Sequence, residues 1–153
     1  MKDVLSLDDI HLSGKRVLYR VDINSPLHPE TGAFLDDGRL RAIIPTLADL
    51  SESKVVILGH QSRPGKDDFT DLSGHAERLG SILGRAIRFV PDVCGEEAID
   101  AIRSLQNGEI LCLDNVRMHN EEISLKKEAL EELRISQIVL NLAPEFDAYV
   151  TDA

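Results

Sequence analysis

The 153-residue sequence predicts an α/β fold in which a mostly parallel sheet lies between two layers of helices. Short apolar runs alternate along the chain with amphipathic segments, which is the order expected of βαβ units. The runs are continuously apolar rather than alternating with polar residues, so each strand is expected to be buried on both faces. Together these observations predict a doubly wound, Rossmann-like, three-layer domain.

Five apolar runs are predicted as strands, and they span residues 16–23, 54–59, 86–90, 109–113 and 148–151. The second run, KVVILG, is rich in the β-branched residues that favour strands. The fifth run lies close to the end of the sequence. A family resemblance described below implies that the sheet is incomplete at its C-terminal edge.

Amphipathic segments between these runs are predicted as helices at about 36–50, 73–84, 98–107, 124–133 and 137–143. Pro45 interrupts the first segment, so a kink is expected there. Ser73 and Ser124 are the predicted N-caps of the second and fourth segments, and Gly84 is expected to end the second. Residues 27–35 contain turn formers and are predicted as a small hairpin or loop.

The sequence has 17 basic and 27 acidic residues, which gives a formal net charge of −10. Proteins that bind nucleic acid or an anionic membrane usually carry a basic surface, so neither partner is expected. No signal peptide is evident, and no apolar run is long enough for a transmembrane helix. Cys94 and Cys112 show no metal-binding spacing and are expected to be buried, reduced thiols. These observations predict a cytoplasmic protein.

Several motifs with known chemistry are missing from the sequence. There is no GxxxxGK[ST] loop, no GxGxxG after the first strand and no GxSxG elbow. The five His residues form no HxH or HExxH pair, which argues against a His-based zinc site. The sequence therefore predicts neither a nucleotide site nor a metal site on this chain.

Polar side chains follow three of the predicted strands, at the edge where ligands of open α/β sheets bind. These residues are Asp22, Asn24, His60, Arg63 and Arg117, and Arg39 lies near the start of the first predicted helix. Taken singly, each has a structural explanation, such as turn capping for Asp22 or a surface ion pair for Arg39. Their convergence on one sheet edge predicts a site for a small anionic ligand, because arginine binds carboxylate and phosphate bidentately.

Five segments resemble the phosphoglycerate kinase family in order and spacing: RVDINSPL at 20–27, DDGRLRAIIPTL at 36–47, GHQSRPG at 59–65, LDNVRMHNEE at 113–122 and YVTDA at 149–153. HQSRPG and the short loops are similar to the archaeal branch of the family. The resemblance covers essentially all of residues 1–153. It matches only the N-terminal, substrate-binding domain, and the nucleotide-binding C-terminal domain is absent from the sequence.

The resemblance implies a phosphoglycerate kinase, a transferase of glycolysis and gluconeogenesis. Such an enzyme moves a phosphoryl group reversibly between 1,3-bisphosphoglycerate with ADP and 3-phosphoglycerate with ATP. This chain would supply the 3-phosphoglycerate half-site. MgATP or MgADP would bind to the absent C-terminal domain, so no cofactor is expected on this chain.

The resemblance also implies a role for each candidate residue. Asp22 and Asn24 would bond the hydroxyl and carboxylate side of the substrate. The 3-phosphate would be held by three side chains, His60, Arg63 and Arg117. Arg39 would reach the substrate carboxylate or acyl-phosphate and would be the catalytic residue, since phosphoryl transfer depends on positioning and positive charge.

The chain by itself is expected to be inactive, because it carries only half of the family's machinery. The alternative hypothesis is a stand-alone or vestigial domain that binds a phosphorylated acid without catalysis. An incomplete sheet exposes an unpaired strand edge, so lower stability and some self-association are predicted.

Overall fold

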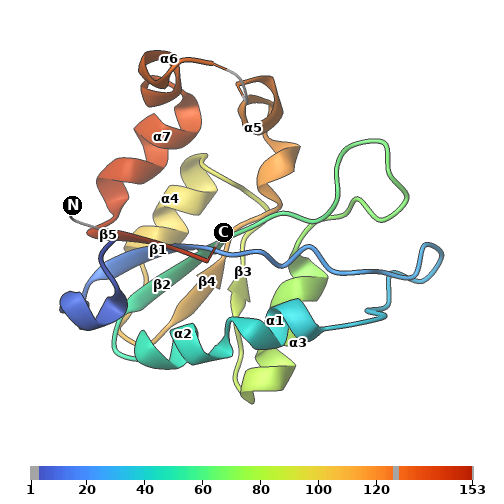
Figure 1. The fold of residues 1–153 in the computed structure, drawn as a ribbon, viewed down its shortest axis with the longest axis horizontal. Coiled ribbons are helices and arrows are strands. Elements are labelled where there is room, and N and C mark those ends of the chain that lie inside the picture. Colours follow the sequence, from blue (N-terminus) through green and yellow to red (C-terminus); the bar gives the residue numbers. More distant parts are fainter. Residues whose placement is uncertain (1–3, 126–127, 153) are drawn as a thin grey trace.

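A five-stranded parallel sheet forms the centre of the molecule (Figure 1). The computed structural model describes residues 4–125 and 128–152, and within them the strands lie in the order β3-β4-β2-β1-β5. Their bounds are β1 Arg16–Arg20, β2 Lys54–Leu58, β3 Arg88–Phe89, β4 Ile110–Cys112 and β5 Ala148–Thr151. Every neighbouring pair is parallel. The predicted α/β class is confirmed.

Four of the strands are shorter than the apolar pattern predicts, and only β5 has the predicted bounds. β1 ends at Arg20, although Val21 and Ile23 remain buried. The backbone N–H of Val21 still donates to the carbonyl of Leu58 at 3.0 Å, and the backbone N–H of Asp22 then donates to the side chain of Asp152 at 3.0 Å. Apolar runs therefore mark the extent of burial, which continues beyond the hydrogen-bonded strand.

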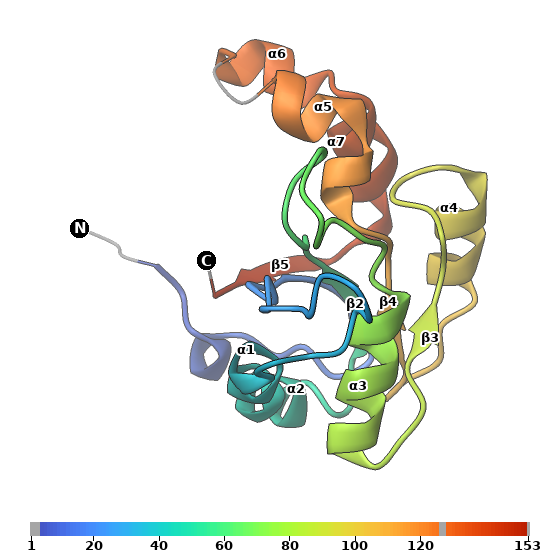
Figure 2. The same cartoon turned by 90° about the vertical axis from the view of Figure 1, so that its right-hand side faces the viewer.

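Helices cover both faces of the sheet (Figure 2). One layer consists of α1 (Gly38–Ala42), α2 (Ile44–Asp49) and α3 (Ser73–Leu83). The other contains α4 (Glu96–Arg103) and α7 (Gln137–Leu142), with α5 (Asn120–Ser124) and α6 (Leu130–Arg134) on the same side. Three short 3-10 turns complete the described elements: η1 (Leu7–Asp9), η2 (Val116–Met118) and η3 (Ala143–Glu145). The three-layer prediction is confirmed.

Two apolar cores result, because successive strand residues point to opposite faces of the sheet. In β2, Val55 and Ile57 pack toward α1, α2 and α3, whereas Val56 packs toward α4 and α7. Cys112 belongs to the first core and Cys94 to the second, and both are free thiols, as predicted. Burial raises the pKa of Cys112 to about 12, so this thiol stays protonated.

The sequence signals for breaks and turns agree with the structure. The predicted first helix is two helices, and Pro45 lies in the first turn of α2, where its missing N–H removes no hydrogen bond. Gly84 ends α3 in the left-handed conformation with φ 67°. Residues 27–35 form a small hairpin in which Leu27 and Phe34 make an antiparallel bridge.

Two predicted N-caps are wrong. Ser73 is the first residue of α3, and the Asp71 side chain accepts from its backbone N–H at 2.9 Å. Ser124 is the last residue of α5 rather than the cap of a following helix. The predicted helix over 124–133 is therefore replaced by two short helices, and residues 126–127 of that segment lie outside the described residues.

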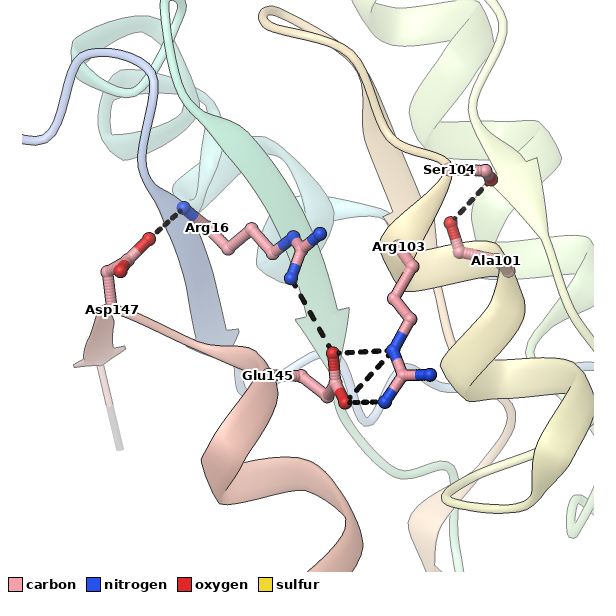
Figure 3. A network of polar contacts seen from close by, with 6 residues as sticks. All are labelled: Arg16, Ala101, Arg103, Ser104, Glu145 and Asp147. Carbon is pink, nitrogen blue, oxygen red and sulfur yellow. Dashed lines mark hydrogen bonds and ion pairs between the residues drawn. The ribbon is translucent and has the colours of Figure 1, made fainter.

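Figure 3 shows how the start of the edge strand β5 is anchored. The Glu145 carboxylate accepts from Arg103 at 2.6 Å and pairs with Arg16 at 3.5 Å. Asp147 accepts from the backbone N–H of Arg16 at 2.9 Å. These contacts tie β5 to β1 and α4 at the amino end of the sheet. Among the described helices, none has the length and apolar character needed to cross a membrane.

Candidate anion-binding site

The loops that follow β1, β2 and β4 meet at one edge of the sheet. Parallel strands place their carboxyl ends together, and the order β4-β2-β1 makes the three loops neighbours. The loop after β1 carries Asp22 and Asn24, the loop after β2 carries His60 and Arg63, and Arg117 follows β4. Arg39 comes from the first turn of α1. All six predicted residues thus lie on elements at this edge.

Arg39 and Asp22 form an ion pair at the mouth of the loop after β1. Their side chains are 51% and 47% exposed, so the pair is open to solvent and to a ligand. Asp152 holds the loop from behind by accepting from the backbone N–H of Asp22. A ligand carboxylate or phosphoryl oxygen can take the place of Asp22 as partner of the guanidinium.

Asn24 connects the loop after β1, called the first loop, to the loop after β2, called the second; the loop after β4 is the third. Its Oδ1 accepts from the backbone N–H of Ser62 at 2.9 Å. Because the amide oxygen is engaged in this way, a ligand at Asn24 would meet the amide nitrogen, which is a donor. The residue therefore suits an anionic or hydroxyl oxygen.

Arg117 is held over the second loop from η2. Its Nη1 donates to the backbone carbonyl of Ser62 at 2.6 Å, and its backbone N–H donates to Oδ1 of Asn115 at 3.1 Å. The guanidinium has further N–H donors, which point to bidentate binding of an anion. Arg117 and Asn24 thus contact the same residue, Ser62, at its carbonyl and its N–H respectively.

His60 is half-buried at the end of β2 among charged side chains. Burial lowers its pKa, and the positive charges of Arg117 and Arg20 lower it further, while Asp22 and Glu122 partly offset this effect. Arg20 is itself paired with Glu122 at 2.7 Å. The His60 imidazole is therefore neutral at pH 7. A bound phosphate dianion would favour the protonated imidazole and so couple ligand binding to proton uptake.

Arg63 stands apart from the other five residues. Its side chain is exposed and makes no hydrogen bond or ion pair within residues 4–125 and 128–152, and its backbone carbonyl accepts from the backbone N–H of Lys66 at 3.2 Å. The structure therefore places Arg63 on the correct loop but against none of the other predicted residues. Its contact with a ligand stays a prediction.

Several residues that shape the site were missed in the sequence. Gln61, His75 and Asn115 are buried polar side chains, and each is 2% exposed or less. Ser62 has φ 57° and is the one non-glycine residue with positive φ in the described part of the chain. This strained conformation persists because surrounding contacts fix the residue, a condition common at binding sites. The one sequence signal for Gln61 and Ser62 was their place in a polar run that directly follows the buried strand β2.

The described geometry defines a class of protein. Arginine and histidine side chains with amide donors gather at the carboxyl edge of a parallel sheet. This arrangement is suited to a small anion with carboxylate or phosphate groups. The molecule is therefore an α/β domain with a candidate anion-binding site at the carboxyl ends of its strands.

Comparison with known proteins identifies the family. The phosphoglycerate kinase family model matches residues 7–153. Phosphoglycerate kinases of Methanothermobacter thermautotrophicus and Thermoplasma volcanium are 45% and 42% identical to the chain over 150 and 153 residues. The crystal structure of phosphoglycerate kinase from Pyrococcus horikoshii OT3 matches with a TM-score of 0.92 and 34% identity over 98% of the chain. This chain belongs to the phosphoglycerate kinase family.

The chain spans about a third of the length of these relatives. The matches cover 97% and 100% of the chain but only 36% and 37% of the Methanothermobacter and Thermoplasma proteins. The chain likewise covers 36% of the Pyrococcus protein. The resemblance noted in the five sequence segments is thus confirmed for the family.

Proposed function

We propose that residues 1–153 form the N-terminal, substrate-binding domain of a phosphoglycerate kinase and bind 3-phosphoglycerate or 1,3-bisphosphoglycerate. The observation that carries this proposal is the gathering of Asp22, Asn24, Arg39, His60 and Arg117 at one sheet edge. 3-Phosphoglycerate has an anionic group at each end. The site offers Arg39 beside the first loop and Arg117 with His60 beside the second and third.

In this proposal the two ends of the substrate meet different residues. Asp22 and Asn24 form hydrogen bonds with the hydroxyl and carboxylate side of the substrate, where the amide nitrogen of Asn24 is a donor. The 3-phosphate is held by His60, Arg63 and Arg117. Arg39 is the catalytic residue, since its exposed guanidinium can leave Asp22 and stabilise negative charge on the moving phosphoryl group.

The proposed reaction is reversible phosphoryl transfer between 1,3-bisphosphoglycerate with ADP and 3-phosphoglycerate with ATP. The described residues contain no group of three or more His, Cys, Asp or Glu side chains that could hold a metal ion. We propose that MgATP or MgADP is bound by the additional length found in the relatives rather than by residues 1–153. The free, buried thiols support a reducing, cytoplasmic location.

A ligand titration followed by NMR tests the proposal. The 153-residue chain is titrated with 3-phosphoglycerate, and glycerate, which has no phosphate, is the control. Shifts of the backbone amides near Asp22, Arg39, His60 and Arg117 with 3-phosphoglycerate, and much weaker shifts with glycerate, are expected. A well-dispersed spectrum in which 3-phosphoglycerate moves no amide would overturn the assignment of the half-site.

The alternative function, a stand-alone or vestigial domain that binds a phosphorylated acid without catalysis, is separated by a second assay. The chain is mixed with the remaining two thirds of a relative such as the Methanothermobacter protein, and phosphoryl transfer to ADP is measured. Activity that appears only in the mixture favours the kinase half-site. Tight ligand binding without activity favours the binding domain.

A further inference from the structure

The buried side chain of Gln61 joins two of the loops that form the site. Its Oε1 accepts from the backbone N–H of Ser25 at 2.9 Å, and its Nε2 donates to the backbone carbonyl of Ser25 at 2.9 Å. The amide thus pairs with both backbone groups of a residue 36 positions earlier. Since Ser25 follows Asn24 and Gln61 follows His60, this pairing fixes two ligand-binding candidates relative to each other.

The orientation of this amide is determined by its partners. A backbone N–H can only donate and a carbonyl can only accept, so the oxygen and nitrogen of Gln61 cannot be exchanged. His75 Nε2 lies 2.9 Å from Gln61 Oε1 and must therefore donate. Burial lowers the pKa of His75 to about 4, which keeps the imidazole neutral, and its ring packs edge-on against Phe34. The network has one arrangement.

The third loop is attached to the same residue. The backbone carbonyl of Gln61 accepts from Nδ2 of Asn115 at 2.8 Å, and Oδ1 of Asn115 accepts from the backbone N–H of Arg117. Gln61 is fully buried, with 0% of its surface exposed, so it cannot itself touch a ligand. One inaccessible residue thus links the loops that carry Asn24, His60 and Arg117.

We infer that Gln61 is a positioning residue of the anion site, which holds the three loops in their binding geometry before a ligand arrives. For the identity of the ligand, this inference rests on the proposed function. Loops that are ordered in advance lose less conformational freedom on binding, which increases affinity. Removing the amide should therefore weaken binding by more than a general loss of stability would.

The first test compares Gln61→Leu with two control variants of the chain. Gln106→Leu makes the same change at an exposed position, and Ile102→Val weakens the core away from the site. Dissociation constants for 3-phosphoglycerate are measured by calorimetry, and amide hydrogen exchange of Ser62 is measured without ligand. Gln61→Leu should bind 3-phosphoglycerate at least tenfold more weakly than the unaltered chain, and its Ser62 amide hydrogen should exchange faster. Neither control variant should show these changes.

The outcomes separate the two proposals. If the unaltered chain binds no 3-phosphoglycerate, the proposed function fails. The positioning role is then tested by Ser62 amide exchange alone: faster exchange in Gln61→Leu supports it, and unchanged exchange overturns it. If the unaltered chain binds and Gln61→Leu binds equally well with unchanged Ser62 exchange, the positioning role is overturned while the proposed function stands.

A second variant keeps the test available if Gln61→Leu does not fold. In Gln61→Glu, the protonated carboxyl donates to the Ser25 carbonyl and accepts from the Ser25 N–H as the amide does, whereas the ionised carboxylate cannot donate. His75 contacts the Gln61 side chain, Asp71 lies near His75, Asp114 accepts from the backbone N–H of Leu72, and His60 precedes Gln61 in the chain; all four titratable groups are present in the unaltered chain as well. Affinity relative to the unaltered chain should be nearly equal at pH 5.5 and at least tenfold weaker at pH 8. A ratio that does not change with pH would overturn the inference, and Gln106→Glu is the charge control.

Discussion

His75 makes the stability of this chain depend on pH between about 4 and 6.5. The side chain is 2% exposed, and burial lowers its pKa from 6.5 to about 4. The unfolded chain therefore takes up this proton more readily than the folded chain. Stability is complete above pH 6.5 and falls as the pH falls through this window toward 4.

The magnitude follows from the two pKa values. Their difference, 6.5 minus about 4, is about 2.5 units. At about 1.36 kcal/mol per unit, this corresponds to about 3.4 kcal/mol when the titration is complete. At pH 4.5 about 2.5 kcal/mol of that stability is lost. Since a domain has only about 5–15 kcal/mol in total, the effect is large.

Urea unfolding at pH 7.5 and pH 4.5 measures this loss. The comparison protein is His75→Gln, which keeps a polar side chain but cannot be protonated. Other groups, including His60 and Glu145, titrate in both proteins, so the difference between the two losses isolates His75. The unaltered chain should lose about 2.5 kcal/mol more than the variant. Equal losses would refute the reasoning that burial holds His75 neutral.

Three other predictions concern the candidate site, the contacts that anchor β5, and the exposed side of the edge strand β5. Arg63→Ala should weaken 3-phosphoglycerate binding by about 1–3 kcal/mol in calorimetry, and an unchanged affinity would remove Arg63 from the site. Glu145→Gln loses its charged pairs with Arg103 and Arg16 and should lower urea stability by about 0.5–1 kcal/mol at pH 7. Because Arg103 holds the pKa of Glu145 below its usual value, this difference should shrink as the pH falls below about 4.5. Tyr149 is 60% exposed on β5 and should promote self-association through this edge strand. Sedimentation of Tyr149→Lys should therefore show less dimer than the unaltered chain. An unchanged proportion of dimer would exclude β5 as the surface of self-association.

The sheet and the helix breaks could be predicted because they depend on local signals. The run over β2 is apolar at every position after Lys54, and burial on both faces requires that. Pro45 predicted an interruption of the first helix, and the structure has a division there between α1 and α2. Ser124 failed as a cap because α5 starts earlier, where the side chain of His119 accepts from the backbone N–H of Glu121. Histidine is an uncommon cap, so the sequence gives little warning of it.

The site was predictable only at its surface. Asp22, His60 and Arg117 could be found because polar residues that follow strands collect at one edge of a parallel sheet. Gln61 could not, because its partner Ser25 lies 36 positions away and no local pattern reveals that an amide will pair with a distant backbone. Arg63 is the opposite case, because it was predicted from the HQSRPG segment but its side chain is exposed and contacts none of the other predicted residues.

The separation of the site's parts along the chain has a consequence during synthesis. Contacts that build the pocket span 36 residues between Ser25 and Gln61, 55 between Ser62 and Arg117, and 130 between Asp22 and Asp152. A ribosome that adds about 5–20 residues per second needs several seconds to supply all of them. A nascent chain that ends before Arg117 therefore has no pocket. A ligand of this pocket could therefore stabilise a nascent chain only after Arg117 has been added, and it would not act on shorter folding intermediates.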